Sequence, residues 1–190
     1  MIKLYRKSNP RWDYAEYWNN QEGSLILHIG KLGSEGGTKE YKIGEEYKTE
    51  EEFKQFFLKK YEALGYAPIP DEEMYIVAVQ FPMKSLKGSK RDLWLRDIVE
   101  KYLNDSLGWE GLGHVDGWDM GQLSCKEKKY ALTVFCYVVD AVLGVKNVLS
   151  TLRYSRLDPY RVKIAIKSIK GDSKYVLKYA ADKKDMEFYL

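Results

Sequence analysis

The sequence is poor in the residues that build disulfide frameworks and metal centres. Its 190 residues include only two cysteines and two histidines, too few for a disulfide scaffold, a four-cysteine zinc site or a histidine-rich metal centre. No apolar run approaches the roughly 20 residues that cross a bilayer as a helix. The first residues carry charges instead of the apolar core of a signal peptide. We therefore expect a globular, cytoplasmic protein with no membrane contact, no cofactor and no metal.

Neither sign of charge dominates the chain. The formal net charge is +3, which is too small to require a nucleic-acid partner. The whole basic excess lies in residues 71–190, and lysine and arginine are densest between Tyr160 and Lys184. Such a stripe is typical of the wet face of an edge strand, where lysines oppose aggregation, or of a surface that binds phosphates. The 16 tyrosines favour β-sheet first and a recognition surface second.

A proline-containing connector divides the chain. Pro68 and Pro70 follow Gly65 and precede an acidic run, a composition that ends helices and favours an extended segment. We therefore predict two α+β domains, residues 1–70 and residues 71–190.

The first predicted domain is an antiparallel sheet followed by a helix. Aromatic or alternating segments predict strands at 13–18, 24–29 and 38–43. Thr49 and Glu52 have the spacing of a capping box. Apolar residues then recur at helical spacing from Phe53 to Leu64, and Gly65 provides the stop.

The second predicted domain has another order of elements. The pattern predicts strands at 75–81, near 114–118, at 130–138 and at 160–167, with helices at 89–107 and after Asp140. This β-α-β-β-α-β order is that of the ferredoxin-like sandwich. A hairpin at 174–179 is expected to extend it.

Glycines are concentrated between Gly30 and Gly37. A phosphate-binding P-loop would need a Gly-Lys-Ser/Thr ending and a helix directly after it, and the sequence has neither. The aromatic strands, the segments IGKLG and GGTK, and the helix ending in Gly-Tyr instead resemble the WGR domain, over residues 13–69. That module occurs in DNA-dependent poly(ADP-ribose) polymerases and in assorted bacterial proteins.

The WGR resemblance implies a nucleic-acid interface beside the glycine loop. Gly30, Gly33 and Gly36 match glycines of the family, while Ile29 and Lys31 stand where the family has its signature tryptophan and arginine. The expected nucleic-acid contacts are Lys31, Lys39 and Lys42 in this module, or Arg161, Lys163 and Lys167 in the basic stripe. The alternative is that the glycines serve only the tight backbone of the fold.

A second candidate site lies in the glycine-rich stretch 108–121. Its pattern resembles small bacterial ferredoxin-like proteins of unknown function, over residues 75–169, and some of these are grouped with toxin-immunity proteins. Two tryptophans and a histidine beside acidic residues favour a rim that docks a protein partner, because aromatic anchors dominate interface energetics. The resemblance implies that this partner is a toxin. Alternatively, the tryptophan at 118 packs in the core while the aspartates hold turns, or His114, Asp116 and Asp119 bind a metal. The expected partner-binding residues are Trp109, His114, Asp116, Trp118 and Asp119.

No pattern of covalent catalysis is visible. Cys125 lies beside Lys126 and Lys128, cations that lower a thiol pKa, but no glycine-flanked nucleophile elbow is present. Cys136 lies in an apolar strand and is expected to pack. The leading hypothesis is therefore a non-catalytic bacterial intracellular binding protein associated with nucleic acid. An immunity-type protein that neutralises a toxin is the alternative, and a metal-dependent enzyme is the third hypothesis.

Overall fold

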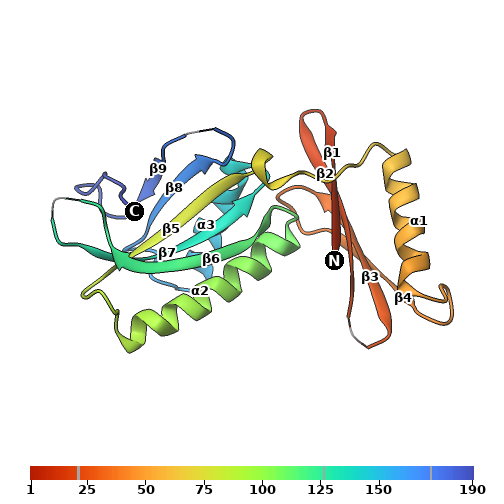
Figure 1. Cartoon of the computed structure of the whole chain (residues 1–190), viewed down its shortest axis with the longest axis horizontal. Coiled ribbons are helices and arrows are strands. Elements are labelled where there is room, and N and C mark those ends of the chain that lie inside the picture. The colour runs from red at the N-terminus through yellow and green to blue at the C-terminus, as the bar shows by residue number, and fades with distance from the viewer. Residues whose placement is uncertain (21, 126, 172) are drawn as a thin grey trace. The chain divides into compact units, whose positions relative to one another are not determined.

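The computed structural model describes residues 1–20, 22–125, 127–171 and 173–190 (Figure 1). Gln21, Lys126 and Asp172, which the sequence places in turns and loops, lie outside the described residues. The described chain is α+β, with a four-stranded and a five-stranded antiparallel sheet and three α-helices. It forms two compact units. Unit 1 is Met1–Ile69 with Trp109–Gly111, and unit 2 is Pro70–Gly108 with Leu112–Leu190.

Unit 1 is a meander of four strands in the order β1-β2-β3-β4, with helix α1 against one face. The predicted strands and helix are confirmed, but the sequence did not predict β1. In β1, Leu4 and Tyr5 are both buried although they are adjacent and so point to opposite faces. The pattern therefore lacks the alternation that identifies a strand. The elements are β1 (Ile2–Ser8), β2 (Arg11–Asn19), β3 (Ser24–Lys31), β4 (Gly37–Lys42) and α1 (Glu50–Ala63).

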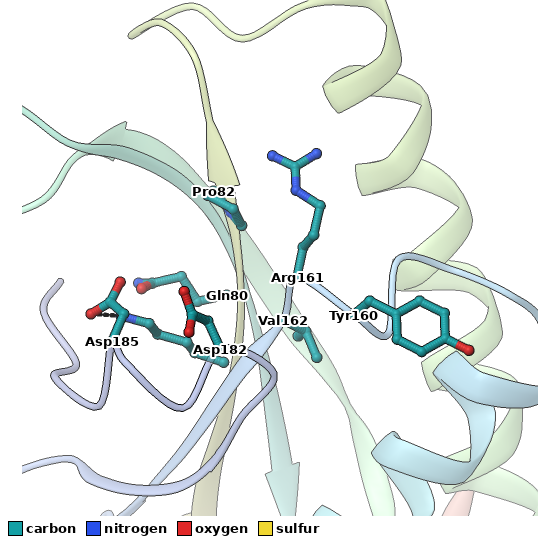
Figure 2. A pocket seen from close by; sticks show the side chains of 8 residues that line it. Gln80, Pro82, Tyr160, Arg161, Val162, Asp182 and Asp185 are labelled. Atoms are coloured by element: carbon teal, nitrogen blue, oxygen red, sulfur yellow. Dashed lines mark ion pairs between the residues drawn. The ribbon is translucent and has the colours of Figure 1, made fainter.

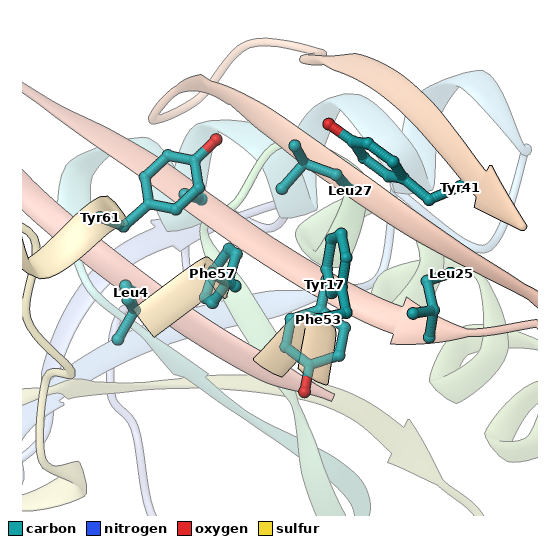
Figure 3. Close-up of a cluster of buried hydrophobic side chains, with 9 residues drawn as sticks. Leu4, Tyr17, Leu25, Leu27, Tyr41, Phe53, Phe57 and Tyr61 are labelled. Carbon is teal, nitrogen blue, oxygen red and sulfur yellow. The ribbon is translucent and has the colours of Figure 1, made fainter. Parts of the chain in front are cut away.

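Helix α1 begins at the predicted cap. The Thr49 hydroxyl accepts a hydrogen bond from the Glu52 amide at 3.2 Å, and the Glu52 carboxylate accepts one from the Lys48 amide at 2.8 Å. These bonds satisfy amides that a helix start otherwise leaves unpaired. Its aromatic stripe packs on the sheet in a cluster of buried side chains (Figure 3). The cluster contains Leu4, Ala15, Tyr17, Leu25, Leu27, Tyr41, Phe53, Phe57 and Tyr61.

Unit 2 is a sheet in the order β6-β7-β5-β8-β9, and every neighbouring pair is antiparallel. A short 3₁₀ helix, η1 (Asp71–Glu73), precedes it. The elements in chain order are β5 (Tyr75–Met83), α2 (Lys90–Trp109), β6 (Gly113–Gln122), β7 (Tyr130–Val138), α3 (Ala141–Tyr154), β8 (Lys163–Ser168) and β9 (Val176–Ala180).

The two faces of this sheet differ. Helices α2 and α3 lie on one face and meet where Asn147 and Thr151 hydrogen-bond to Ser106. At the centre of the sheet, the strand residues beneath the helices are completely buried, among them Val77, Val79, Val134 and Ile164. On the other face, Lys163 pairs in register with Gln80, which pairs with Thr133. Residues 182–190, which we call the strap, run across this second face after β9.

The edge strand within the basic stripe is β9, while β8 pairs with β5 and β9 on either side. One detail of the strand predicted at 160–167 was wrong. Tyr160 was expected on its buried face, but it precedes the strand and is 88% exposed. The expected alternation does hold from Val162 onward, since Val162 and Ile164 are completely buried. Lys163, which lies between them, therefore points away from the helices.

Candidate functional site

We call Arg161, Lys163 and Lys167 the basic row. Lys163 and Lys167 lie on one face of β8, because a spacing of four residues places them on the same side of a strand, and Arg161 lies in the turn just before β8. Register pairs Lys167 with Ile76 and Ile76 with Tyr137, so a cation, an aliphatic side chain and an aromatic ring lie side by side across three strands. Of the residues that the sequence marks as candidate nucleic-acid contacts, the structure thus places Lys163 and Lys167 on one strand face, and Arg161 lines the same pocket as Lys163.

Each cation of the row has different surroundings. The Lys163 ammonium lies 2.7 Å from the Asp185 carboxylate and donates a hydrogen bond of 2.7 Å to the Glu187 carbonyl. Arg161 lies 3.9 Å from Asp158, whose same oxygen is 2.6 Å from Arg91. No carboxylate of the described residues pairs with Lys167, whose ammonium lies 5.8 Å from the centre of the Tyr175 ring.

An aromatic cluster adjoins the basic row. It consists of Tyr137 on β7, Tyr175 just before β9 and Phe188 in the strap, all half-buried. The rings of Tyr175 and Phe188 have centroids 5.5 Å apart. Burial raises the pKa of the Tyr175 hydroxyl, and the nearby Tyr137 hydroxyl raises that pKa further. Both phenols therefore stay neutral at physiological pH and present flat, uncharged rings.

A pocket of about 300 Å³ opens beside Lys163. Figure 2 shows Asp182 and Asp185 on one side of this pocket, Tyr160 on the other, and Arg161 between them. Gln80 and Pro82 of β5 also line it. The lining combines cations, carboxylates and an exposed ring, but no nucleophile placed against a general base. It is suited to binding through charge and stacking.

The expected rim residues on β6 do not all lie on one face of that strand. Trp109 belongs to unit 1 by its contacts, while the other four residues lie on β6 of unit 2. On β6, His114 and Asp119 share the face of Tyr137 and Thr133, whereas Trp118 pairs with Val134 on the helix-covered face. Trp118 is 44% exposed, and the Arg96 guanidinium lies 4.4 Å from the centre of its ring. The alternative that it packs in the core is therefore wrong.

Asp116 lies at an irregularity in β6. The register of β6 on β7 shifts between Val115 and Gly117. Burial raises the pKa of Tyr137, and the adjacent Asp116 carboxylate raises that pKa further. His114, Asp116 and Asp119 do not form a metal-binding group, and the described residues contain no such group of three His, Cys, Asp or Glu side chains.

The three lysines of unit 1 do not form a patch. Lys31 and Lys39 lie on the same face of the sheet as Leu25, Leu27 and Tyr41, which is the face that α1 covers. The Lys39 ammonium lies 4.4 Å from the centre of the Tyr41 ring. Lys42 has the opposite parity. The three exposed ammonium groups thus divide between two faces of the sheet.

The glycine loop of unit 1 surrounds buried polar side chains that sequence reasoning missed. Lys3, Tyr14, Glu16 and His28 form this buried polar cluster. Glu16 pairs with Lys3 at 2.9 Å and with His28 Nδ1 at 2.8 Å, and His28 Nε2 lies 3.0 Å from the Tyr14 hydroxyl. Register places Lys3 opposite Glu16 and Glu16 opposite His28. Only this cross-strand pairing, which the sequence does not display, could have identified the cluster.

The glycines make room for that cluster. A Cβ on Gly36 would lie 2.5 Å from the Tyr14 hydroxyl and 2.6 Å from His28 Nε2, and would also collide with the Ile29 carbonyl. A Cβ on Gly30 would lie 2.8 Å from the Tyr14 hydroxyl. These two glycines are therefore explained by packing.

The two cysteines lie in different surroundings. Both are free thiols. Cys136 is completely buried, and burial raises the pKa of its thiol to about 12. The Cys125 thiol donates to the Glu127 carbonyl at 3.0 Å.

Comparisons with protein-family models, with curated proteins and with solved structures found no match. None of the helices in the described part of the chain is both long and apolar enough to cross a membrane.

Proposed function

We propose that this chain is a non-catalytic binding protein whose unit 2 holds a single strand of nucleic acid on the sheet face that carries the basic row. The observation that carries this proposal is that Lys163 and Lys167 share one face of β8 next to the aromatic cluster, while Arg161, in the turn before the strand, lines the same pocket as Lys163. Cations in a row neutralise successive phosphates and release counterions, which supplies most of the affinity of such complexes.

The aromatic cluster favours a single strand over a duplex. Unpaired bases stack on aromatic side chains, and each stacked base contributes about 1–3 kcal/mol. In a duplex the bases are paired and stacked already, so their faces do not reach a sheet. The carboxylates of Asp116 and Asp119 on β6 repel phosphates. We therefore place the strand over β5, β8 and β9.

We further propose the ferredoxin-like arrangement for unit 2 and the WGR arrangement for unit 1. The strand order β6-β7-β5-β8, with helices after β5 and β7, supports the first. The meander, the terminal helix and the packing of Gly30 and Gly36 support the second. Because the lysines of unit 1 divide between two faces, the proposed binding surface is the one on unit 2.

The test is fluorescence anisotropy with a labelled oligothymidylate and a matched duplex. Replacing Arg161, Lys163 and Lys167 together by alanine should weaken binding of the single strand at least tenfold. It should also reduce the slope of log K against log salt by about 2, since each phosphate contact contributes about 0.7.

The matched control is the triple alanine variant of Lys31, Lys39 and Lys42, which removes the same charge from unit 1. We expect it to bind like the wild type. Absence of binding at low salt, or equal losses in the two triple variants, would contradict the proposal.

A protein partner on β6 is the second candidate function, in keeping with an immunity-type role. The observation that favours it is the exposed ring of Trp118 on an edge strand. If Trp118 anchors a toxin, Trp118→Ala should weaken that complex by about 2 kcal/mol or more, while Trp94→Ala, which removes another exposed tryptophan of unit 2, should not. A complex that is recovered undiminished with Trp118→Ala would exclude this role.

A further inference from the structure

The strap occupies the same face as the proposed ligand. Its contacts follow a path across the sheet, beginning at β8, where Lys163 holds Asp185 and the Glu187 carbonyl. The path continues at β5, where the Gln80 amide donates to the Tyr189 carbonyl at 2.8 Å. It ends beyond β6, where the Ser124 amide donates to the Leu190 carbonyl at 2.8 Å.

The groups that the strap places on this face resemble those of a nucleotide. A carboxylate, from Asp185, accepts from the Lys163 ammonium as a phosphate oxygen would. An aromatic ring, from Phe188, packs against Tyr175 as a base would. A phosphate in the place of the Asp185 carboxylate and a base in the place of the Phe188 ring would displace the strap from Lys163 and Tyr175.

From these contacts, we propose that the strap is an internal competitor: nucleic acid reaches Lys163 and the rings of Tyr137 and Tyr175 only after residues 182–190 have moved off the sheet. This inference rests on the proposed function, and it concerns the regulation of that same face.

The strap is attached weakly enough to be displaced. Asp185 is 42% exposed in its ion pair, and exposed pairs contribute little to stability. Met186 and Leu190 are also exposed, at 55% and 42%. The strap contains no helix or strand among its residues, so few backbone hydrogen bonds hold it.

The sheet beneath keeps its own hydrogen bonds when the strap leaves. Gln80 also donates to the Thr133 hydroxyl at 3.1 Å, so its buried amide is not left without a partner. The pocket beside Lys163 already opens one side of the strap to solvent. A phosphate can approach Arg161 there before the Asp185 contact breaks.

The test compares two double variants of the strap. Asp185→Asn with Phe188→Ala removes the carboxylate on Lys163 and the ring on Tyr175. The matched control, Glu187→Gln with Met186→Ala, removes the same charge and one exposed side chain. It leaves both contacts intact, because Lys163 binds the Glu187 carbonyl and the Glu187 carboxylate binds the Tyr189 hydroxyl.

We expect the Asp185/Phe188 variant to bind oligothymidylate about tenfold more tightly than the wild type, and the control to bind unchanged. Hydrogen exchange provides a second readout. The Ser124 amide and the strap amides should exchange faster in the Asp185/Phe188 variant without ligand, and in the wild type when oligothymidylate is added. Thermal melting establishes that each variant is folded.

The outcomes separate the two proposals. Tight binding by the wild type, with a strap that stays protected in the complex and no gain in the Asp185/Phe188 variant, would overturn the competitor role and leave the proposed function standing. Failure of every variant to bind, the freed Asp185/Phe188 variant included, would overturn both.

Discussion

The two units place residues of the same types in different surroundings. Unit 1 buries its most conspicuous polar group, with Glu16 and His28 3% and 0% exposed, and disperses its candidate lysines over two faces. Unit 2 holds Lys163 and Lys167 of its basic row on one face beside half-buried rings. Whether lysines form a binding surface depends on the strand register that places them on one accessible face. It does not depend on their number and spacing along the sequence alone.

The largest loss of stability should come from removing the carboxylate of the buried polar cluster. Glu16→Ala leaves Lys3 and His28 without their shared carboxylate, and breaking a buried pair from one side costs about 3–5 kcal/mol. Denaturant unfolding measures this loss. Glu40→Ala, on the exposed part of β4, should change stability by less than about 0.5 kcal/mol. A loss of stability below about 1 kcal/mol for Glu16→Ala would contradict the expectation that the buried polar cluster contributes more to stability than an exposed carboxylate does.

A methyl group at Gly36 should have the next largest effect. Gly36→Ala pushes against Tyr14 and His28, and overpacking of this kind costs about 1–3 kcal/mol. Gly37→Ala is the matched control, since its Cβ would meet nothing within 4 Å. The same denaturant experiment compares the two. Equal stability of both variants would show that the glycines of the loop are not required by packing.

The smallest effect should be a loosening of the strap in acid. The hydrogen bond from Lys163 lowers the pKa of the Asp185 carboxyl below its ordinary value of 3.8, with Lys129 and the Glu187 amide acting in the same direction. A lowered pKa means that the pairing is complete above the ordinary value and is lost as the pH falls through the lowered one. Nuclear magnetic resonance of the Gln80 side-chain amide, which donates to Tyr189, should report this release.

The control for the acid experiment is Asp185→Asn. Its Gln80 signal should not follow the same low-pH transition, because no carboxylate remains to be protonated at that position. An identical transition in the variant and the wild type would show that other groups cause the change in the Gln80 signal, and would contradict the role of the Asp185 carboxylate in holding the strap.

The sequence predicted what local patterns determine. The capping box at Thr49, the stripe of α1 and the alternation after Val162 each depend on neighbours within one element, and all three are found in the structure. The mixed α+β class followed from them. Strand β1 was missed because both of its faces are covered, which removes the alternation.

The rest of the candidate site depends on pairing between distant segments. The meeting of Lys167, Ile76 and Tyr137 follows from the register of β8 on β5 and of β5 on β7. The strap has no periodicity of its own, and its position follows from single contacts such as that of Asp185 with Lys163. Neither arrangement can be deduced from residue spacing.

The most direct test of the central claim is a chemical-shift map of the chain titrated with oligothymidylate. We predict that the perturbed amides cluster on β5, β8 and β9 and in the strap, and that those of the glycine loop in unit 1 do not shift. Perturbations confined to residues 30–42, or no saturable perturbation anywhere at low salt, would contradict it.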